Sequence, residues 1–248
     1  MRLLILGGTT EASVLARHIA GRSDLMPVLS LAGRTRHPVA PPIPYRMGGF
    51  GGVAGLKAYL VDAGIDAVID ATHPFAAQMS NHAAEACRDL KLPLVQFTRA
   101  PWHPAEGDRW LAVPDMEAAT QALGTAPRRV LLTVGGLQLA AFVAAPQHHY
   151  VIRTIDPPET AKSLPDHRLI LARGPFALND EIALMREECI DVLVTKNSGG
   201  GATEAKLEAA RTLGIEVIMV ERPKAGNVPA FEELDAVMSW IEDHRPTP

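Results

Sequence analysis

The chain has little that would suggest thiol, metal or nucleic-acid chemistry. Only two of its 248 residues are cysteines, Cys87 and Cys189, and each lies inside a predicted helix. We therefore expect two buried, unpaired thiols in a reducing compartment rather than a disulfide. The formal net charge is −4, which argues against a globally basic nucleic-acid-binding surface but still allows a local basic cleft.

Long hydrophobic runs are also missing. No apolar stretch approaches the roughly 18 residues that a membrane-spanning helix needs. The N-terminus begins with a strand pattern and glycines, not with an apolar segment that ends in small residues. We therefore expect a cytoplasmic protein that binds neither membranes nor nucleic acid. The sequence leaves the oligomeric state open, a monomer included.

Several catalytic motifs are absent as well. None of Tyr45, Tyr59 and Tyr150 has a lysine four residues later, which argues against the short-chain dehydrogenase mechanism. The chain contains no G-x-S-x-G, C-x-x-C, H-E-x-x-H or Walker sequence. His148 and His149 have no third ligand at a regular spacing, so we predict no metal site.

What the chain does contain is a regular alternation of strand and helix patterns. Apolar strand candidates lie at residues 3–6, 27–31, 67–69, 94–97, 130–134, 150–155, 168–172, 192–195 and 217–220. Helical patterns lie between and after them, near residues 11–20, 53–63, 76–90, 116–123, 137–144, 177–188, 203–213 and 231–244. This alternation predicts an α/β fold with parallel sheets flanked by helices on both faces.

The chain should divide into two Rossmann-like domains. A strong strand pattern begins again after residues 124–127 and, like the first strand, runs into paired glycines and then a helix. We therefore expect domains at residues 1–125 and 126–248, although the last helix could pack on either one. In such sheets ligands bind at the carboxyl ends of the strands, so functional residues should be sought there.

The first strand end carries the strongest local signal. Leu3–Leu6 is followed by Gly7-Gly8-Thr9-Thr10-Glu11 and then at once by a helix. Glycine lets the backbone approach an anion, and the free N–H groups and dipole of the helix start attract it. This predicts a dinucleotide phosphate site, although the glycines are adjacent and do not match G-x-G-x-x-G. The alternative is a plain tight turn that Thr9 or Thr10 caps.

The second strand ends in Gly33, Arg34 and Thr35. At this position a dinucleotide enzyme contacts the adenosine ribose, where an acidic residue would bind the 2′-hydroxyl and an arginine accommodates a 2′-phosphate. The planar fork of Arg34 suits phosphate, and no acidic residue is nearby, so the pattern favours NADPH over NADH. The alternative is a solvated loop arginine.

Two further segments of the first half have a weaker signal. The glycine-rich stretch 48–52 could approach a ligand or serve only as a flexible turn. Thr72, His73 and Pro74 follow the strand at 67–69, where Pro74 suits the first turn of the next helix. Thr72 and His73 could contact the cofactor, and His73 is a candidate proton donor. The alternative is that His73 only satisfies loop carbonyls.

Cationic and polar side chains gather at other strand ends and predict an anionic ligand on an acidic protein. The residues are Arg99 in the first half and Arg153, Arg173, Lys196, Asn197, Ser198, Gly199 and Gly200 in the second. The Lys196–Gly200 loop joins a strand to a helix through glycines and side-chain donors, which suits an anion. The alternative is that these charges are simply solvated.

Taken together, the segments resemble the precorrin-6A reductase family of cobalamin biosynthesis. The matching segments are residues 7–12, 32–35, 70–76, 133–136, 173–176 and 195–200. The resemblance runs from the first strand to Arg222-Pro223. It implies two Rossmann-like domains with a ligand cleft between them. It also implies an oxidoreductase that acts on a CH–CH group with NADP as acceptor and reduces a double bond of precorrin-6A to give precorrin-6B.

The tetrapyrrole substrate carries many carboxylates, which accounts for the cationic strand ends. On this interpretation NADPH lies along the Gly7–Glu11 turn, and the second domain binds substrate. Three alternatives stay open: the cobalt-containing substrate of the anaerobic pathway, a non-catalytic NADPH-sensing protein, and a nucleotide-sugar transferase.

Overall fold

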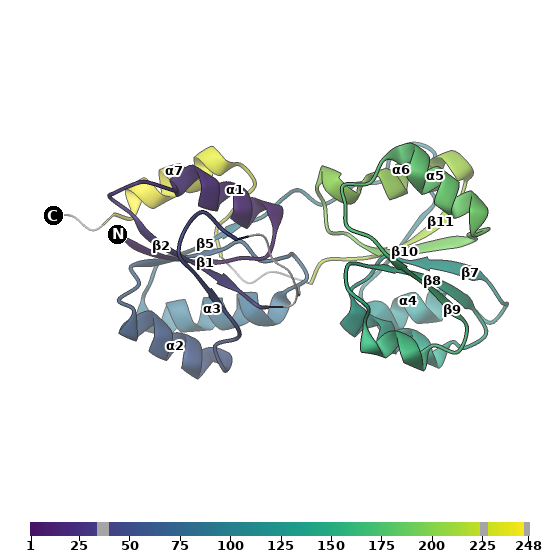
Figure 1. Ribbon diagram of the computed structural model, residues 1–248, viewed down its shortest axis with the longest axis horizontal. Coiled ribbons are helices and arrows are strands. Elements are labelled where there is room, and N and C mark those ends of the chain that lie inside the picture. The colour runs from purple at the N-terminus through teal and green to yellow at the C-terminus, as the bar shows by residue number, and fades with distance from the viewer. Residues whose placement is uncertain (34–39, 224–227, 246–248) are drawn as a thin grey trace. The chain divides into compact units, whose positions relative to one another are not determined.

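The computed structural model describes residues 1–33, 40–223 and 228–245. The chain forms two compact units: Met1–Ala100 with Pro223–Pro248 make unit 1, and Pro101–Arg222 make unit 2. Each unit is a parallel sheet with helices on both faces, as the alternation of strand and helix patterns predicts (Figure 1).

The sheet of unit 1 has the strand order β3-β2-β1-β4-β5-β12. Its strands are β1 (Arg2–Leu6), β2 (Met26–Leu31), β3 (Tyr45–Met47), β4 (Ala67–Asp70), β5 (Leu94–Phe97) and β12 (Ala230–Phe231). All of these neighbours pair in parallel. The order of strands reverses between β1 and β4, and ligands of such sheets bind beyond the carboxyl ends at this switch point.

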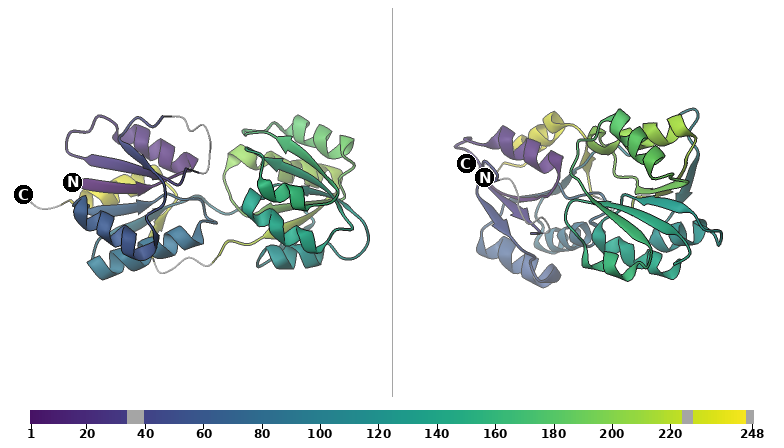
Figure 2. Two further views of the ribbon diagram at one scale, coloured as in Figure 1. Left: turned by 60° about the horizontal axis from the view of Figure 1, so that its bottom comes forward. Right: turned by 45° about the vertical axis from the view of Figure 1, so that its right-hand side comes forward.

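Helices cover both faces of the unit 1 sheet. They are α1 (Thr10–Ile19), α2 (Gly52–Asp62), α3 (Ala77–Leu90) and α7 (Leu234–Asp243). In Figures 1 and 2, α1 and α7 lie on one face and α2 and α3 on the other. Every residue of β1 after Arg2 is buried, because a strand with helices on both faces has no solvent side.

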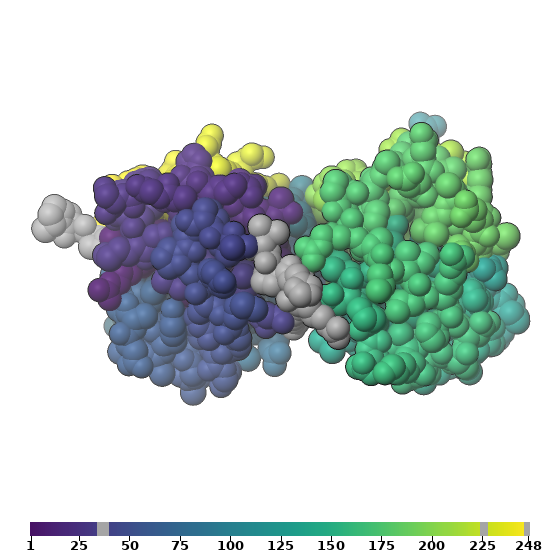
Figure 3. Space-filling view, in the orientation of Figure 1, coloured from purple at the N-terminus to yellow at the C-terminus, as the bar shows by residue number. Residues whose placement is uncertain are grey.

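The side chains of β1 show how one strand serves two cores. Leu3 and Ile5 pack in a cluster with residues of α1 and α7, whereas Leu4 and Leu6 pack in a second cluster with residues of α2 and α3. Successive side chains of a strand point to opposite faces, which produces this division. Figure 3 shows atoms of the C-terminal segment, in yellow, bordering those of α1, in purple.

Unit 2 has the same arrangement, with the strand order β9-β8-β7-β10-β11-β6. Its strands are β6 (Trp110–Val113), β7 (Arg129–Leu132), β8 (His149–Thr154), β9 (His167–Leu171), β10 (Val192–Lys196) and β11 (Glu216–Val220). Every one of these pairings is parallel. The switch point of this sheet lies between β7 and β10.

The helices of unit 2 also cover both faces of their sheet. α5 (Leu178–Glu187) and α6 (Ala205–Leu213) lie on one face, and α4 (Met116–Ala122) lies on the other (Figure 1). Three 3₁₀ segments complete the unit: η1 (Gly136–Ala144), η2 (Glu159–Ser163) and η3 (Gly201–Thr203). Leu131 of β7 and Leu193 of β10 pack in one cluster with residues of α5 and α6.

The division between the units differs from the expected boundary at residues 125 and 126. β6 and α4 belong to unit 2, because Trp110–Val113 add a parallel strand beside β11. β12 and α7 belong to unit 1, because Ala230–Phe231 pair with β5 and α7 packs beside α1. In each sheet one edge strand thus pairs with a strand more than a hundred residues away, which local patterns do not reveal.

Several element predictions need correction. The helix predicted at residues 137–144 is the 3₁₀ helix η1, in which Leu139 and Phe142 are buried three residues apart, the repeat of a 3₁₀ helix. The strands β3, β6 and β12 were not predicted, because short edge strands have weak hydrophobic patterns. Cys87 is buried as expected. The same expectation for Cys189 is wrong, because this residue follows α5 at φ 49° and is exposed.

Within the described residues, the structure contains no helix of the length and apolar character that crossing a membrane requires.

Candidate functional site

The two strongest glycine turns of the sequence both lie at switch points. Residues 7–11 follow β1, next to the end of β4, and residues 196–200 begin at the last residue of β10, next to the end of β7. Each position is where a doubly wound sheet forms its ligand crevice. The structure thus places one candidate site in each unit.

In the β1–α1 turn the two glycines meet different requirements. A Cβ on Gly7 would lie 2.5 Å from Leu29 Cδ1 and 3.2 Å from the Cβ of Ala12, so a larger residue would have to displace the Leu29 side chain and would crowd the start of α1. Gly8 has φ +114°, a conformation that side chains disfavour, and the space around it is open. Close packing and an open backbone are the features that let a phosphate reach the start of a helix.

Thr9 is the N-cap of α1 and also ties two strand ends together. Its side chain accepts a hydrogen bond from Ala12 N at 3.2 Å, and its hydroxyl donates to the carbonyl oxygen of Ala71 at 2.7 Å. Ala71 follows β4, so this one hydroxyl joins the turns on both sides of the switch point. Thr10 is the exposed first residue of α1. Of the two residues considered as the cap in the tight-turn alternative, Thr9 is therefore the N-cap. A capped turn is also compatible with an anion site.

Glu11 and Arg99 pair with each other. Arg99 Nη1 lies 2.8 Å from Glu11 Oε2, and both side chains are largely buried. Arg99 follows β5, so the pair brings a cation to the β1–α1 turn of unit 1. The structure thus unites a residue predicted to contact the cofactor with one predicted to contact the substrate.

After β4 the chain folds into a hydrogen-bonded turn. Asp70 Oδ1 accepts hydrogen bonds from Thr72 N at 3.1 Å and from the Thr72 hydroxyl at 2.7 Å. His73 Nδ1 accepts a hydrogen bond from Phe75 N at 3.2 Å, so the proton of the neutral ring lies on Nε2. α3 begins at Ala77, so the expectation that Pro74 starts this helix is wrong; Pro74 lies in the preceding turn, closed by Ala76 N and the carbonyl oxygen of His73.

The end of β2 is described only in part. Gly33 has φ +71°, whereas Arg34 and Thr35 lie outside the described residues. The predicted 2′-phosphate contact therefore stays a prediction.

The glycine-rich stretch beside β2 is held by Arg46, a residue that the sequence reasoning missed. Its guanidinium donates to the carbonyl oxygens of Gly48 and Gly49 at 2.9 and 3.0 Å, and it lies 4.0 Å from the ring centroid of Phe50. These contacts give the stretch a defined conformation. Arg46 could have been noticed from the sequence, because it lies at a strand end between two aromatic residues, Tyr45 and Phe50.

In unit 2, the turn after β7 lies against the end of β10. A Cβ on Gly135 would lie 2.6 Å from Gln138 Oε1 and 3.9 Å from Lys196 Nζ, so the half-buried Lys196 reaches this turn. Gly199 and Gly200 have φ +69° and +78°, which side chains rarely adopt. The predicted loop thus has a cation at its start and an adaptable backbone after it.

The other two polar residues of this loop make internal contacts. The side chain of Asn197 bonds to the main chain of Trp102 through both its oxygen and its nitrogen. Ser198 N donates to the carbonyl oxygen of Lys196 at 2.6 Å. Arg222, after β11, donates to the carbonyl oxygens of Asn197 and Ser198.

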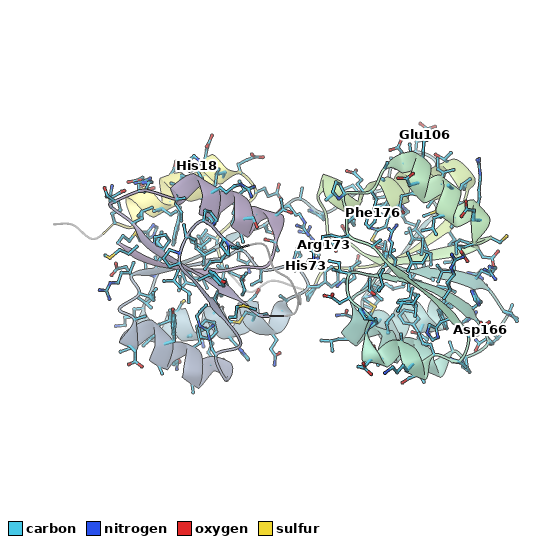
Figure 4. The ribbon with its side chains drawn as sticks, in the orientation of Figure 1. His18, His73, Glu106, Asp166, Arg173 and Phe176 are labelled. Carbon is cyan, nitrogen blue, oxygen red and sulfur yellow. The ribbon has the colours of Figure 1, made fainter. Side chains whose placement is uncertain are left out.

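Arg153 and Arg173 occupy different environments. Arg173 is exposed, whereas Arg153 is buried on β8, where it pairs with Glu181 of α5. The Arg153 guanidinium also lies 3.9 Å from the ring centroid of Phe176. Arg173 and Phe176, both labelled in Figure 4, lie on the same segment, before α5. Because Arg153 contacts Phe176, it holds the segment that carries Arg173.

These arrangements can bind anions in both units. Unit 1 offers a helix start with an open glycine backbone, and unit 2 offers Arg173 and Lys196. Across the described ranges no group of three or more histidine, cysteine or acidic side chains could hold a metal ion.

Comparison with known proteins assigns the chain to a family. The family model described as precorrin-6x reductase CbiJ/CobK matches residues 2–242. A precorrin-6A reductase of Rhodobacter capsulatus is 53% identical over 247 residues, which cover 100% of this chain and 98% of the relative. One from Mycobacterium tuberculosis is 44% identical over 241 residues, which cover 97% of each chain.

A cobalt-precorrin-6A reductase of Priestia megaterium is less similar, at 30% identity over 71% of this chain and 74% of the relative. Among solved structures, one titled CobK precorrin-6A reductase is 52% identical, covers 100% of this chain and 98% of its own, and superposes with a TM-score of 0.92. The chain therefore belongs to the precorrin-6x reductase CbiJ/CobK family, and it is a reductase of a C=C bond in cobalamin biosynthesis.

Proposed function

We propose that this chain reduces precorrin-6A to precorrin-6B with NADPH. The observation that carries the proposal is the β1–α1 turn at the switch point of unit 1, where Gly7 and Gly8 leave the backbone open to a phosphate. The high identity to precorrin-6A reductases supports the choice of substrate.

Unit 1 would hold the cofactor. Gly7, Gly8, Thr9 and Thr10 present the start of α1 to the pyrophosphate, because the first N–H groups of a helix have no partner within it. Arg99 offsets the charge of Glu11, which would otherwise repel a phosphate beside it. Gly33, Arg34 and Thr35 would contact the adenosine ribose and its 2′-phosphate. When bound, NADPH supplies the hydride that the reduction needs.

Unit 2 would hold the macrocycle. Arg173 and Lys196 are the side chains best placed to bind its acetate and propionate groups, because Arg173 lies just after β9 and Lys196 is the last residue of β10. Gly199 and Gly200 let the loop backbone donate as well. Arg153 contributes indirectly, because Glu181 and Phe176 surround it.

His73, with Thr72 and Pro74 beside it, would lie at the reacting end of the cofactor site. With Nδ1 accepting from Phe75 N, the ring presents an Nε2–H donor. This donor can orient a ligand. His73 is also the candidate proton source for the carbon next to the one that receives the hydride, but it must then be an imidazolium: Nδ1 takes a proton from water in place of the Phe75 N contact, and the ring returns to its neutral form when Nε2 gives up its proton.

The identities favour the metal-free macrocycle over its cobalt form. Precorrin-6A reductases are 44–53% identical to this chain over nearly all of its length, whereas cobalt-precorrin-6A reductases are 27–31% identical. The test compares initial rates of NADPH oxidation with each macrocycle under anaerobic conditions. We expect precorrin-6A to be preferred, and a higher kcat/KM for cobalt-precorrin-6A would overturn the choice.

The cofactor is tested separately at Arg34. Arg34→Ala should raise KM for NADPH and leave KM for NADH nearly unchanged, because only NADPH carries the 2′-phosphate. Equal changes for both cofactors would remove Arg34 from the site. A wild-type chain that oxidises neither cofactor with any macrocycle would favour an NADPH-sensing role.

A further inference from the structure

The oxygen and the nitrogen of the Asn197 side-chain amide both bond to one main-chain residue. Its Oδ1 accepts a hydrogen bond from Trp102 N at 2.7 Å, and its Nδ2 donates to the Trp102 carbonyl oxygen at 3.0 Å. The two residues are 95 positions apart in the sequence. A side chain that pairs with both polar groups of one peptide residue fixes the position and direction of that segment.

Arg222 ties a second segment to the same loop. Its Nε donates to the carbonyl oxygen of Asn197 at 2.8 Å, and its Nη2 donates to that of Ser198 at 3.0 Å. The planar guanidinium suits two neighbouring acceptors, which an ammonium group would not hold in the same geometry. The Lys196–Gly200 loop is therefore held from two sides by residues of unit 2.

These two residues mark the points where the chain enters and leaves unit 2. The unit begins at Pro101, directly before Trp102, and it ends at Arg222. Both connections to unit 1 therefore meet unit 2 at residues bonded to Asn197 or Ser198. Within unit 2, the predicted substrate loop and the two connecting segments form one hydrogen-bonded group.

The segment after the first connection is itself firmly seated. Trp102 is 7% exposed in the core beside α6, and Lys206 Nζ lies 4.6 Å from its ring centroid. Further along, Arg211 of α6 donates to both carboxylate oxygens of Asp108 at 2.9 and 3.1 Å. A displacement of Asn197 would thus act on a segment that is packed and hydrogen-bonded against α6.

We propose that Asn197 is a positioning residue, which sets the conformation of the substrate loop and couples macrocycle binding to the chain segments that connect the two units. The proposal rests on the proposed function, because it takes residues 196–200 to be the macrocycle loop. It departs from the expectation that the Asn197 amide binds substrate directly. The amide acts through Trp102 and leaves Lys196 and the glycine backbone to meet the carboxylates.

The experiment compares full-length Asn197→Ala with Asn179→Ala, an exposed asparagine of α5 in the same unit. Steady-state rates give KM for precorrin-6A and for NADPH separately. We expect Asn197→Ala to raise KM for precorrin-6A by about tenfold, because the loop loses its preorganised conformation. KM for NADPH should stay within about twofold, and Asn179→Ala should match the wild type.

Hydrogen exchange supplies a second readout. Adding precorrin-6A without NADPH should slow amide exchange in residues 101–109 of the wild type, and this slowing should be absent in Asn197→Ala. Arg222→Lys keeps the charge and loses the two-acceptor geometry, so it should raise KM for precorrin-6A in the same direction. This variant keeps the test decisive if Asn197→Ala folds poorly.

The outcomes separate this inference from the proposed function. If the wild type turns over and both Asn197→Ala and Arg222→Lys show wild-type KM values, or a loss of stability alone, the positioning role is overturned and the reductase remains. If ligand-induced slowing at residues 101–109 persists in Asn197→Ala, the coupling is overturned. A wild-type chain that neither binds nor reduces precorrin-6A overturns the proposed function and this inference with it.

Discussion

Replacing Thr9 by valine removes one hydroxyl that makes two contacts, and it tests the cofactor turn directly. Valine has nearly the same shape and keeps the packing. The variant loses the cap of α1, which is worth about 1 kcal/mol. It also removes the donor to the carbonyl oxygen of Ala71, which costs roughly a further 1 kcal/mol. We therefore expect unit 1 to lose about 2 kcal/mol of its free energy of unfolding, which lowers its Tm by roughly 6–12 °C.

The same substitution should weaken cofactor binding more than substrate binding. The Thr9 hydroxyl joins the β1 and β4 turns, so its loss loosens the backbone that would bind the pyrophosphate. We expect KM for NADPH to rise about tenfold, which corresponds to about 1.4 kcal/mol, and KM for precorrin-6A to change less than about twofold. Thermal unfolding and initial-rate measurements check both expectations.

Thr9→Ser is the matched control. Serine keeps a hydroxyl in reach of both partners, so it should retain the NADPH KM and most of the stability. The reasoning is refuted if Thr9→Val lowers Tm as expected while its KM for NADPH stays at the wild-type value. Such a result would make the turn a purely structural cap.

Three further predictions concern unit 2, the proton donor and pH. Lys196→Ala should raise KM for precorrin-6A about tenfold, whereas Lys162→Ala, at an exposed surface lysine, should not; equal values for the two variants would exclude Lys196 from the site. His73→Ala should lower kcat roughly 10²-fold at saturating ligands if His73 gives the proton, and a near-normal kcat would leave it a structural residue.

Burial raises the pKa of Asp108, but hydrogen bonds, first from Arg211, outweigh it and hold the pKa below its ordinary value of 3.8. The stability that Asp108 adds should therefore be present above that pH and fade below it, so acid titrations of wild type and Asp108→Asn should converge. A constant difference in unfolding free energy down to the lowest pH would contradict this.

The sequence predicts the layers of this fold well and its division into units poorly. Leu3–Leu6 and Val192–Val194 are continuous apolar runs, and such runs are typical of parallel strands covered on both faces. The boundary depended instead on which sheet β6 and β12 join. That choice is made by pairing with strands more than a hundred residues away, and it leaves no local pattern in either segment.

For the candidate site, the sequence predicts where a residue lies but not which residue it contacts. The strand pattern predicts that Gly7, Gly8 and Lys196 lie at carboxyl edges of parallel sheets, and the structure has them there. The pattern could not show that Arg153 is buried against Glu181 or that Asn197 pairs with Trp102. Residue type predicts what a side chain can bind, and only the packed structure shows which partner it has.

The most direct test of the central claim follows the hydrogen that NADPH transfers. The wild-type chain would be mixed anaerobically with precorrin-6A and with NADPH deuterated at either face of C4, and the macrocycle product would be analysed by mass spectrometry. The account predicts that one of the two labelled forms delivers a single deuterium to the macrocycle as NADPH is consumed. Deuterium absent from the product with both forms, while the macrocycle is still reduced, would contradict it.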